Sequence, residues 1–223
     1  MFESALMKMS RLCCLLGCLL ALAISDYAQA DEPSGILNED GFQSIMPTKE
    51  ASGWVKEVVR NEDGTIEGDG CYTKQAFANF ILRFDFQLKP ASNSGIGIRV
   101  FPGENAAFSG MEIQVLDDGH EQYKTIKEWQ AHGSVYGIAP AKRGHLKPTG
   151  EWNTEEIMVN GRSVKVTLNG KVINEINLDQ VAPNGASLDE RPHPGLGRAS
   201  GFISLCGHGG GVKFRNMRVM RLP

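Results

Sequence analysis

Long apolar segments are scarce in this sequence. The longest, from Leu12 to Ile24, falls short of the ~18 consecutive apolar residues that a membrane-spanning helix needs. Lys8 and Arg11 precede this run and Ala28-Gln29-Ala30 follows it, which is the pattern of a secretory signal peptide. We therefore expect a cleaved signal peptide, no membrane span, and a periplasmic or secreted protein.

The rest of the chain lacks internal repeats and any linker that would divide it. We therefore predict a signal peptide over residues 1–30 and a single domain over residues 31–223, a length that allows a sizeable core. Leu15 to Cys18 also resembles a lipoprotein box. Because the apolar stretch continues past Cys18, a lipid anchor is the less favoured alternative.

Cysteine is equally scarce beyond the signal peptide. Of the five cysteines, Cys13, Cys14 and Cys18 lie in that segment, which leaves Cys71 and Cys206. Two cysteines in an exported chain can pair, but they do not make a disulfide framework. We favour two free thiols and leave a single bridge open.

The sequence also lacks a strong excess of charge and the usual cofactor motifs. The formal net charge is −3 and no basic stripe is visible, which argues against a nucleic-acid partner. No H-E-x-x-H or paired-cysteine spacing predicts a zinc site, and no dinucleotide-binding motif occurs. We expect no cofactor, although a divalent cation such as calcium, bound by loop carboxylates, stays open.

What the chain does contain is alternation. Apolar and polar residues alternate through residues 80–88, 95–101 and 111–117, which predicts antiparallel strands with one buried face. Residues 155–179 hold Asn160-Gly161 and Asn169-Gly170 between alternating runs, which predicts a three-stranded meander with two tight hairpins.

Two closing strands are expected within residues 201–210 and 212–222. Helical periodicity is weak, and only a short turn or helix near residues 122–128 is predicted. Residues 181–199, rich in proline and glycine, are expected to be a long loop at the edge of a site. The prediction is an all-β sandwich.

Several segments together resemble the bacterial 3-keto-disaccharide hydrolase domain family. The matching segments, in order, are NSGIGIR, SGMEIQVLDD, GSVYGIAPAKRGHLKPTGEWN, VKVTLNGKVI and GFISLCGHGG, within roughly Gly41 to Leu222. The resemblance implies a concanavalin-A-like jelly roll of two curved antiparallel sheets, with a carbohydrate site on the concave face. It also implies a glycoside substrate oxidised to a ketone at C3, which a separate oxidoreductase would have to supply.

A ketone at C3 makes the C2 proton acidic, and the resulting enolate can expel the C1 substituent. This chemistry needs a base, an acid, and a cation or hydrogen-bond donor for the enolate oxygen. Period-two alternation would place Arg99, Glu112, Gln114 and His208 on one face of a sheet. We expect Glu112 and His208 to transfer protons, Arg99 to stabilise the enolate, and Gln114 to orient the sugar.

Further candidates for substrate binding are Tyr136, Lys147 and Asp117. Tyr136 could stack on the sugar ring and Lys147 could reach the leaving group from its loop. Asp117 could bind substrate or a cation, with a turn role as the alternative. The family often carries Asp before the histidine, whereas this chain has Gly207, which leaves a role for a neighbouring carboxylate in doubt.

Two other functions are compatible with the same residues. Glu112, Gln114 and Asp117 have the spacing of the E-x-D-x-x-E motif of laminarinase-type retaining endo-glucanases, with both later acids altered. A carbohydrate-binding module without chemistry would need only a groove and a few polar groups.

Overall fold

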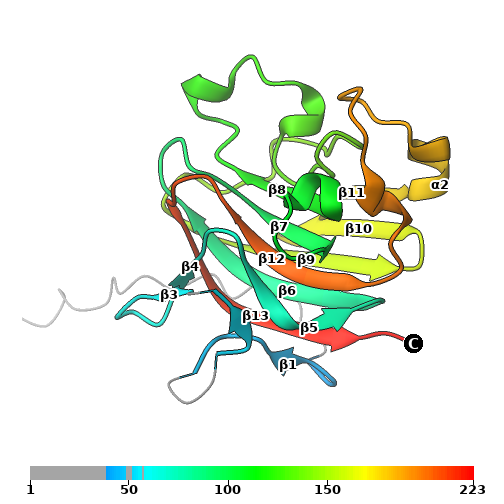
Figure 1. Cartoon of the computed structure of the whole chain (residues 1–223). Helices are drawn as coiled ribbons and strands as arrows, with labels where there is room; N and C mark the ends of the chain where they lie inside the picture. The colour runs from blue at the N-terminus through cyan, green and yellow to red at the C-terminus, as the bar shows by residue number, and fades with distance from the viewer. Residues whose placement is uncertain (1–38, 49–51, 57) are drawn as a thin grey trace, which may run out of the picture. The chain divides into compact units, whose positions relative to one another are not determined.

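The computed structural model describes residues 39–48, 52–56 and 58–223, which form two antiparallel β-sheets packed face to face (Figure 1). The predicted all-β sandwich is thus confirmed. The predicted signal peptide, residues 1–30, lies outside the described residues. No helix in the described ranges is long and apolar enough to cross a membrane.

The larger sheet has eight strands and the smaller one five. The order in the larger sheet is β11 (Lys171–Asn177), β10 (Ser163–Leu168), β9 (Trp152–Asn160), β6 (Phe80–Leu88), β13 (Val212–Arg221), β4 (Ile66–Glu67) and β3 (Val59–Arg60), with β1 (Gln43–Ser44) also paired to β13. The order in the smaller sheet is β2 (Trp54–Val55), β5 (Cys71–Phe77), β12 (Gly201–Gly207), β7 (Asn93–Val100) and β8 (Met111–Leu116).

Helical structure in the described residues is confined to single turns between strands. These are α1 (Ala106–Ser109), α2 (Leu178–Val181), and the 3-10 turns η1 (Glu121–Tyr123), η2 (Glu128–Gln130), η3 (Pro183–Gly185) and η4 (Pro194–Gly197). The helix expected near residues 122–128 is therefore two 3-10 turns, η1 and η2, that flank this segment. The predicted loop over residues 181–199 contains only short turns.

The alternation of each strand determines which side chains enter the core. Phe80, Phe84 and Phe86 of β6 are fully buried, and they belong to one apolar cluster with Ile113 of β8 and its neighbours. The alternate residues of β8 must therefore point away from the larger sheet. This parity puts polar residues on the outer face of the smaller sheet.

The meander of β9, β10 and β11 forms as predicted, with one hairpin shifted. Asn169 and Gly170 have φ values of 49° and 78°, and they form the two-residue turn between β10 and β11. In the other hairpin Asn160 pairs with Ser163, so the turn residues are Gly161 and Arg162. The turn thus begins one residue after the predicted position, because Asn160 still belongs to the ladder.

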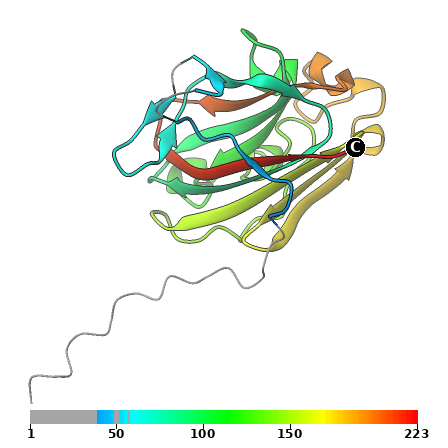
Figure 2. The same cartoon turned by 90° about the horizontal axis from the view of Figure 1, so that it is seen from below.

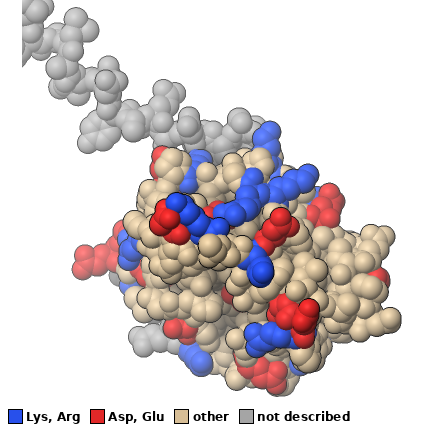
Figure 3. All heavy atoms as spheres, turned by 90° about the horizontal axis from the view of Figure 1, so that it is seen from above, with Lys and Arg blue, Asp and Glu red and all other residues tan. Residues whose placement is uncertain are grey.

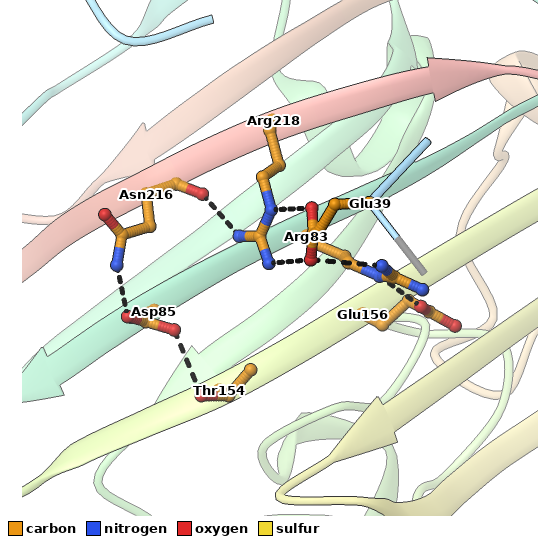
Figure 4. Close-up of polar contacts among 7 residues, drawn as sticks. All are labelled: Glu39, Arg83, Asp85, Thr154, Glu156, Asn216 and Arg218. Atoms are coloured by element: carbon orange, nitrogen blue, oxygen red, sulfur yellow. Dashed lines mark hydrogen bonds and ion pairs between the residues drawn. The ribbon is translucent and has the colours of Figure 1, made fainter. Parts of the chain in front are cut away.

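The outer face of the larger sheet carries a network of charged side chains. Arg83 and Arg218 lie directly opposite each other on β6 and β13, where two like charges would repel. Glu39 accepts hydrogen bonds from both, at 3.2 Å from Arg83 and 2.6 Å from Arg218 Nε, and Glu156 accepts one from Arg83 at 2.7 Å (Figure 4). The hydrogen bonds from Arg218 lower the pKa of Glu39.

This network fastens the start of the described chain to the sheet. Figure 2, which views the larger sheet from below, shows the segment 39–48 (blue) running beside β13 (red). Because these ion pairs are partly exposed, each contributes only ~0.2–1 kcal/mol to stability. Their main effect is to neutralise the Arg83 and Arg218 pair.

A buried histidine and a buried carboxylate connect the two sheets. His132 Nε2 lies 2.9 Å from Glu155 Oε2 of β9, and neither atom has another partner among the described residues. His132 Nδ1 accepts a hydrogen bond from the Leu116 backbone at the end of β8. Since Nδ1 accepts, the hydrogen-bond network assigns the proton to Nε2, which faces Glu155 Oε2 at ion-pair distance but outside hydrogen-bond geometry. A carboxylate that is 0% exposed therefore depends on this one contact.

Replacing His132 by Leu should therefore lower the free energy of unfolding by about 3–5 kcal/mol, because Glu155 loses its one polar contact while staying buried. The double variant His132→Leu with Glu155→Leu should be more stable than His132→Leu alone, since the orphaned carboxylate is gone. Urea unfolding followed by circular dichroism measures both. A double variant less stable than His132→Leu would contradict this interpretation.

Candidate functional site

A hollow of about 200 Å³ lies on the outer face of the smaller sheet. Its floor contains Asn93 of β7, Glu112 and Gln114 of β8, and His208, which follows β12. Figure 1 shows the segment 117–130 (green) and the segment 183–199 (orange) rising above these strands, on the side away from the larger sheet. The remaining wall residues are Asn105, Ala107, Phe108, Leu116, Tyr123, Ile126, Gln130, Tyr136 and Arg191.

Glu112 and His208 meet in this hollow, as the sequence predicted. Glu112 Oε1 and His208 Nε2 are 3.8 Å apart, and the Glu112 side chain is 8% exposed while that of His208 is 48% exposed. The neighbouring Glu112 carboxylate is the main cause that raises the pKa of His208, and the charge of Asp69 adds to it against the opposing effect of burial. The raised pKa therefore favours the imidazolium form of His208 beside Glu112.

Several polar atoms of the floor have no partner within the described protein. Glu112 Oε1, Gln114 Oε1 and Asn93 Oδ1 are buried and make no hydrogen bond there. Buried polar atoms in folded proteins are almost always hydrogen-bonded, so a cluster of exceptions needs an explanation. All three belong to residues that line the hollow, where hydroxyl groups of a ligand could satisfy them.

Two glycines of β7 provide the space for these side chains. Gly95 and Gly97 lie opposite Gln114 and Glu112 on the neighbouring strand. A Cβ atom at position 95 would overlap Glu112 Oε1 and lie 2.7 Å from its Cγ, and one at position 97 would overlap Ser204 Oγ. The Glu112 side chain thus lies over bare backbone.

Tyr136 reaches the hollow because its segment pairs with the edge of β8. The Tyr136 backbone donates to the Glu112 carbonyl at 2.9 Å, and the Gln114 backbone donates to the Ser134 carbonyl at 3.0 Å. The Tyr136 ring packs edge-on against Trp129, with centroids 5.1 Å apart. Tyr136 therefore lines the hollow as predicted, beside Glu112.

Arg99 is elsewhere, and the prediction that it shares the hollow is wrong. Its guanidinium donates to the carbonyls of Ala78 and Gly161, each at 2.9 Å, and to that of Arg198 at 3.2 Å. The register between β7 and β12 shifts at this point and Arg99 has φ 53°, so a β-bulge breaks the alternation and re-aims the side chain. Arg99, 2% exposed, holds loops together at one end of the sheet.

Asp117 and Lys147 also lie outside the hollow. The Asp117 carboxylate accepts hydrogen bonds from the Ala91 backbone at 2.9 Å and from Thr149 Oγ1 at 3.2 Å, and its backbone carbonyl accepts from the His120 backbone, as in the turn considered as its alternative. Lys147 is exposed, and its backbone donates to Asn153 Oδ1. Neither lines the hollow, so the structure does not bring Asp117 and Lys147 together with the Glu112 and His208 pair.

Most of the residues that sequence reasoning missed come from loops and single helical turns, and one, Asn93, is the first residue of β7. Asn105 caps α1, Phe108 lies within it, Gln130 ends η2, and Arg191 belongs to the long loop after β11. The only advance signal was the length and proline content of that loop, which was expected to border a site. Alternation cannot find the loop residues, because they are not on strands, and Asn93 lies one alternation step before the predicted strand over residues 95–101.

The carboxyl group of Asp69 occupies the space beside Gly207, the residue before His208. A Cβ atom at position 207 would overlap the carboxyl group of Asp69, from the turn that precedes β5. Asp69 is distant in sequence from His208, yet its charge contributes to the raised pKa of that histidine. Asp69 therefore supplies, from a distant segment, a carboxylate near His208 that the sequence lacks at position 207.

The two thiols point to opposite faces of the smaller sheet. Cys71 lies opposite Leu205 in the ladder between β5 and β12, and its side chain is buried in the core. Cys206 follows Leu205 in β12, so its side chain lies on the other face, beside Ser204 and Glu112. Both are free thiols. Burial and the Glu112 charge raise the pKa of the Cys206 thiol well above its ordinary value. A protonated thiol is a poor nucleophile.

The described part of the chain contains no group of three or more His, Cys, Asp or Glu residues that could hold a metal ion. Figure 3 looks down on the face that carries the loops of the hollow, and it shows acidic and basic side chains interspersed among uncharged surface.

Comparison with known proteins identifies relatives of this arrangement. Residues 41–220 match the family described as the 3-keto-alpha-glucoside-1,2-lyase-like domain. The chain belongs to this family. A 3-keto-disaccharide hydrolase of Bacteroides thetaiotaomicron is 29% identical over 251 residues, which cover 90% of this chain and 86% of that protein.

Solved structures agree with the fold. A proposed glycosyl hydrolase from Parabacteroides distasonis superposes with a TM-score of 0.68 at 26% identity, covering 81% of this chain and 99% of that one. A second from the same organism gives the same TM-score at 23% identity over 84% of this chain and 99% of that one. The expected resemblance is confirmed, and with it a carbohydrate-active, glycoside-acting hydrolase.

Replacing Gly95 by Ala should displace the Glu112 carboxylate while leaving the fold intact, because the overlap is with the end of a flexible side chain. We expect kcat/KM to fall by at least about 100-fold, the cost typical of a catalytic group misplaced by ~1 Å. Gly119→Ala, where a Cβ atom meets nothing within 4 Å, is the matched control. Equal activities of the two variants would show that Glu112 does not need this space.

Replacing Glu112 by Gln should lower the pKa of His208 toward its ordinary value of 6.5, because the carboxylate that raises it is lost. A raised folded-state pKa means that the pair stabilises the fold fully at low pH, and that this contribution is lost as pH rises through that pKa. NMR titration of the His208 imidazole measures the change, with Glu156→Gln, on the opposite sheet, as control. An unmoved titration would rule out the pairing.

Proposed function

We propose that this protein cleaves 3-keto-glycosides by removing the proton at C2 and expelling the C1 substituent, followed by addition of water. The observation that carries the proposal is the Glu112 and His208 pair, enclosed in a hollow whose other polar groups suit a sugar. The substrate class follows the printed function of the Bacteroides relative and the description of the family.

In this mechanism Glu112 is the base. Its carboxylate is nearly buried, and its Oε1 atom has no hydrogen-bond partner among the described residues, so that oxygen is available to accept the C2 proton. His208 serves as the acid: its raised pKa keeps the imidazolium populated, and its half-exposed ring can give a proton to the leaving oxygen. Gln114 and Asn93 would hydrogen-bond the sugar hydroxyls and the C3 oxygen.

A double-displacement mechanism has less support. Retaining glycosidases need two carboxyl groups ~5–5.5 Å apart, one as nucleophile and one as acid. Glu112 is the one carboxylate among the residues that line the hollow, and Asp117, the other candidate from the motif spacing, is bonded to Ala91 and Thr149. A hollow with one carboxylate and one imidazolium suits proton transfer better than glycosyl-enzyme formation.

The proposal also includes the setting of the reaction. The sequence of residues 1–30 supports export to the periplasm or beyond, and the sequence contains no dinucleotide-binding motif. A separate oxidoreductase would therefore supply the C3 ketone. Detection of the processed chain, starting near Asp31, in a periplasmic fraction would test export independently of activity.

Incubating the protein with a 3-keto-glucoside in deuterated water should place deuterium at C2 of the released sugar, because the proton returned to C2 comes from solvent after elimination. Mass spectrometry and NMR of the product measure it. Cleavage without deuterium at C2 would indicate direct displacement.

The Glu112→Gln variant separates an enzyme from a binding module in the same assay. We expect it to retain affinity for the sugar and to lose turnover by at least about 100-fold, the lower range for a general base. Sugar binding by the wild-type protein with no turnover of any 3-keto-glycoside would favour a module.

A further inference from the structure

One cation in the wall of the hollow has no role in the mechanism above. Arg191 is the single Lys or Arg among the lining residues, and its Cζ atom lies 4.1 Å from the centroid of the Phe108 ring. No carboxylate in the described residues lies within ion-pair distance of its guanidinium. Arg191 therefore presents an unneutralised positive charge.

The loop that carries Arg191 is anchored to its surroundings. His193 Nδ1 bonds the Ala107 carbonyl of α1 at 2.9 Å, and its Nε2 bonds Asp189 Oδ1 at 3.0 Å, with these two side chains only 1% and 4% exposed. Asp189 Oδ1 also accepts from the Arg191 backbone at 3.2 Å, and the Leu188 backbone donates to the Gly137 carbonyl.

The same loop packs closely at two further points. A Cβ atom at Gly137 would collide with Asp189 and His193, and one at Gly195 would collide with the backbone of Ser109 and Gly110. The backbone of Arg191 is thus fixed from both sides, although its side chain is exposed. Such support reduces the entropy lost when the guanidinium binds a ligand.

The charges of the hollow divide between two walls. On the floor, Glu112 and an imidazolium His208 balance each other, while Arg191 stands on the loop wall without a counter-ion. A sugar ring over Glu112 would direct a substituent toward that wall. Arg presents a planar fork of donors that matches a carboxylate, and stacking on Phe108 orients the fork.

We propose that Arg191 and Phe108 form a subsite that binds a carboxylate on the leaving group of the glycoside. The proposal rests on the proposed function for the position of the sugar ring. It predicts that glycosides with an acidic leaving group, such as a uronic acid or a carboxylated aromatic, are preferred over neutral ones of equal size.

The test compares two substrates in two proteins. The substrates are the 4-carboxyphenyl and 4-carbamoylphenyl 3-keto-glucosides, in both anomers, which differ in charge but little in shape. We expect the ratio of kcat/KM for the carboxylate over the amide to fall at least about tenfold in Arg191→Met, the loss expected for one charge-assisted contact. Arg215→Met is the matched control, because Arg215 also lies over an aromatic ring, Trp152, but on the opposite sheet.

The comparison of ratios removes the intrinsic difference between the two leaving groups. Added salt should reduce the wild-type ratio and leave that of Arg191→Met unchanged. An equal loss on both substrates, or no loss on either, would overturn the proposal.

Failure of the proposed chemistry is distinguishable from failure of the subsite. Calorimetric binding of the unoxidised 4-carboxyphenyl and 4-carbamoylphenyl glucosides needs no turnover. A carboxylate preference that Arg191→Met abolishes would uphold the subsite even if no 3-keto-glycoside is cleaved. Equal affinities of wild type and variant for both ligands would reject it.

Discussion

The close approach of the Glu112 side chain to the bare backbone of Gly95 is the constraint on which the hollow depends. β8 has a buried apolar face, so parity forces Glu112 and Gln114 onto the other face, and any Cβ at position 95 would fill the space that the carboxylate occupies. Pairing of residues 134–136 with the edge of β8 then closes the site from one side and adds Tyr136. A carboxylate is thereby held in a nearly dry position with one oxygen unbonded.

Which positive charge lies beside Glu112 depends on where the side chains of Arg99 and His208 point. Arg99 was expected on the same sheet face as Glu112, but the bulge in β7 sends its guanidinium to three backbone carbonyls instead. His208 takes that place, supported by Asp69 from the turn before β5. A titratable imidazolium in place of a permanent guanidinium changes what the pair can do, because it can give up its proton near neutral pH.

Contacts elsewhere in the fold fix the strands and loops that carry the site. The His132 and Glu155 contact ties the end of β8 to the larger sheet, and the arginine network on the far face neutralises strands that would otherwise repel (Figure 4). The loops above the smaller sheet are fixed by buried polar contacts such as His193 with Asp189. Family membership and the superposed structures from Parabacteroides distasonis fit a sandwich that carries its function on one face.

The sequence by itself determined the strands from β6 onward, their buried faces and the meander, because period-two alternation is a local property that pleating converts directly into inside and outside. It also placed Glu112, Gln114 and His208 on a common face. Its alternation did not predict β1 to β5. Only the tertiary structure decided that Arg99, Asp117 and Lys147 lie outside the hollow and that Asp69, Phe108 and Arg191 lie in or beside it. Bulges break alternation without a clear local signal, and contacts between loops depend on how distant segments pack, which no short stretch of residues encodes.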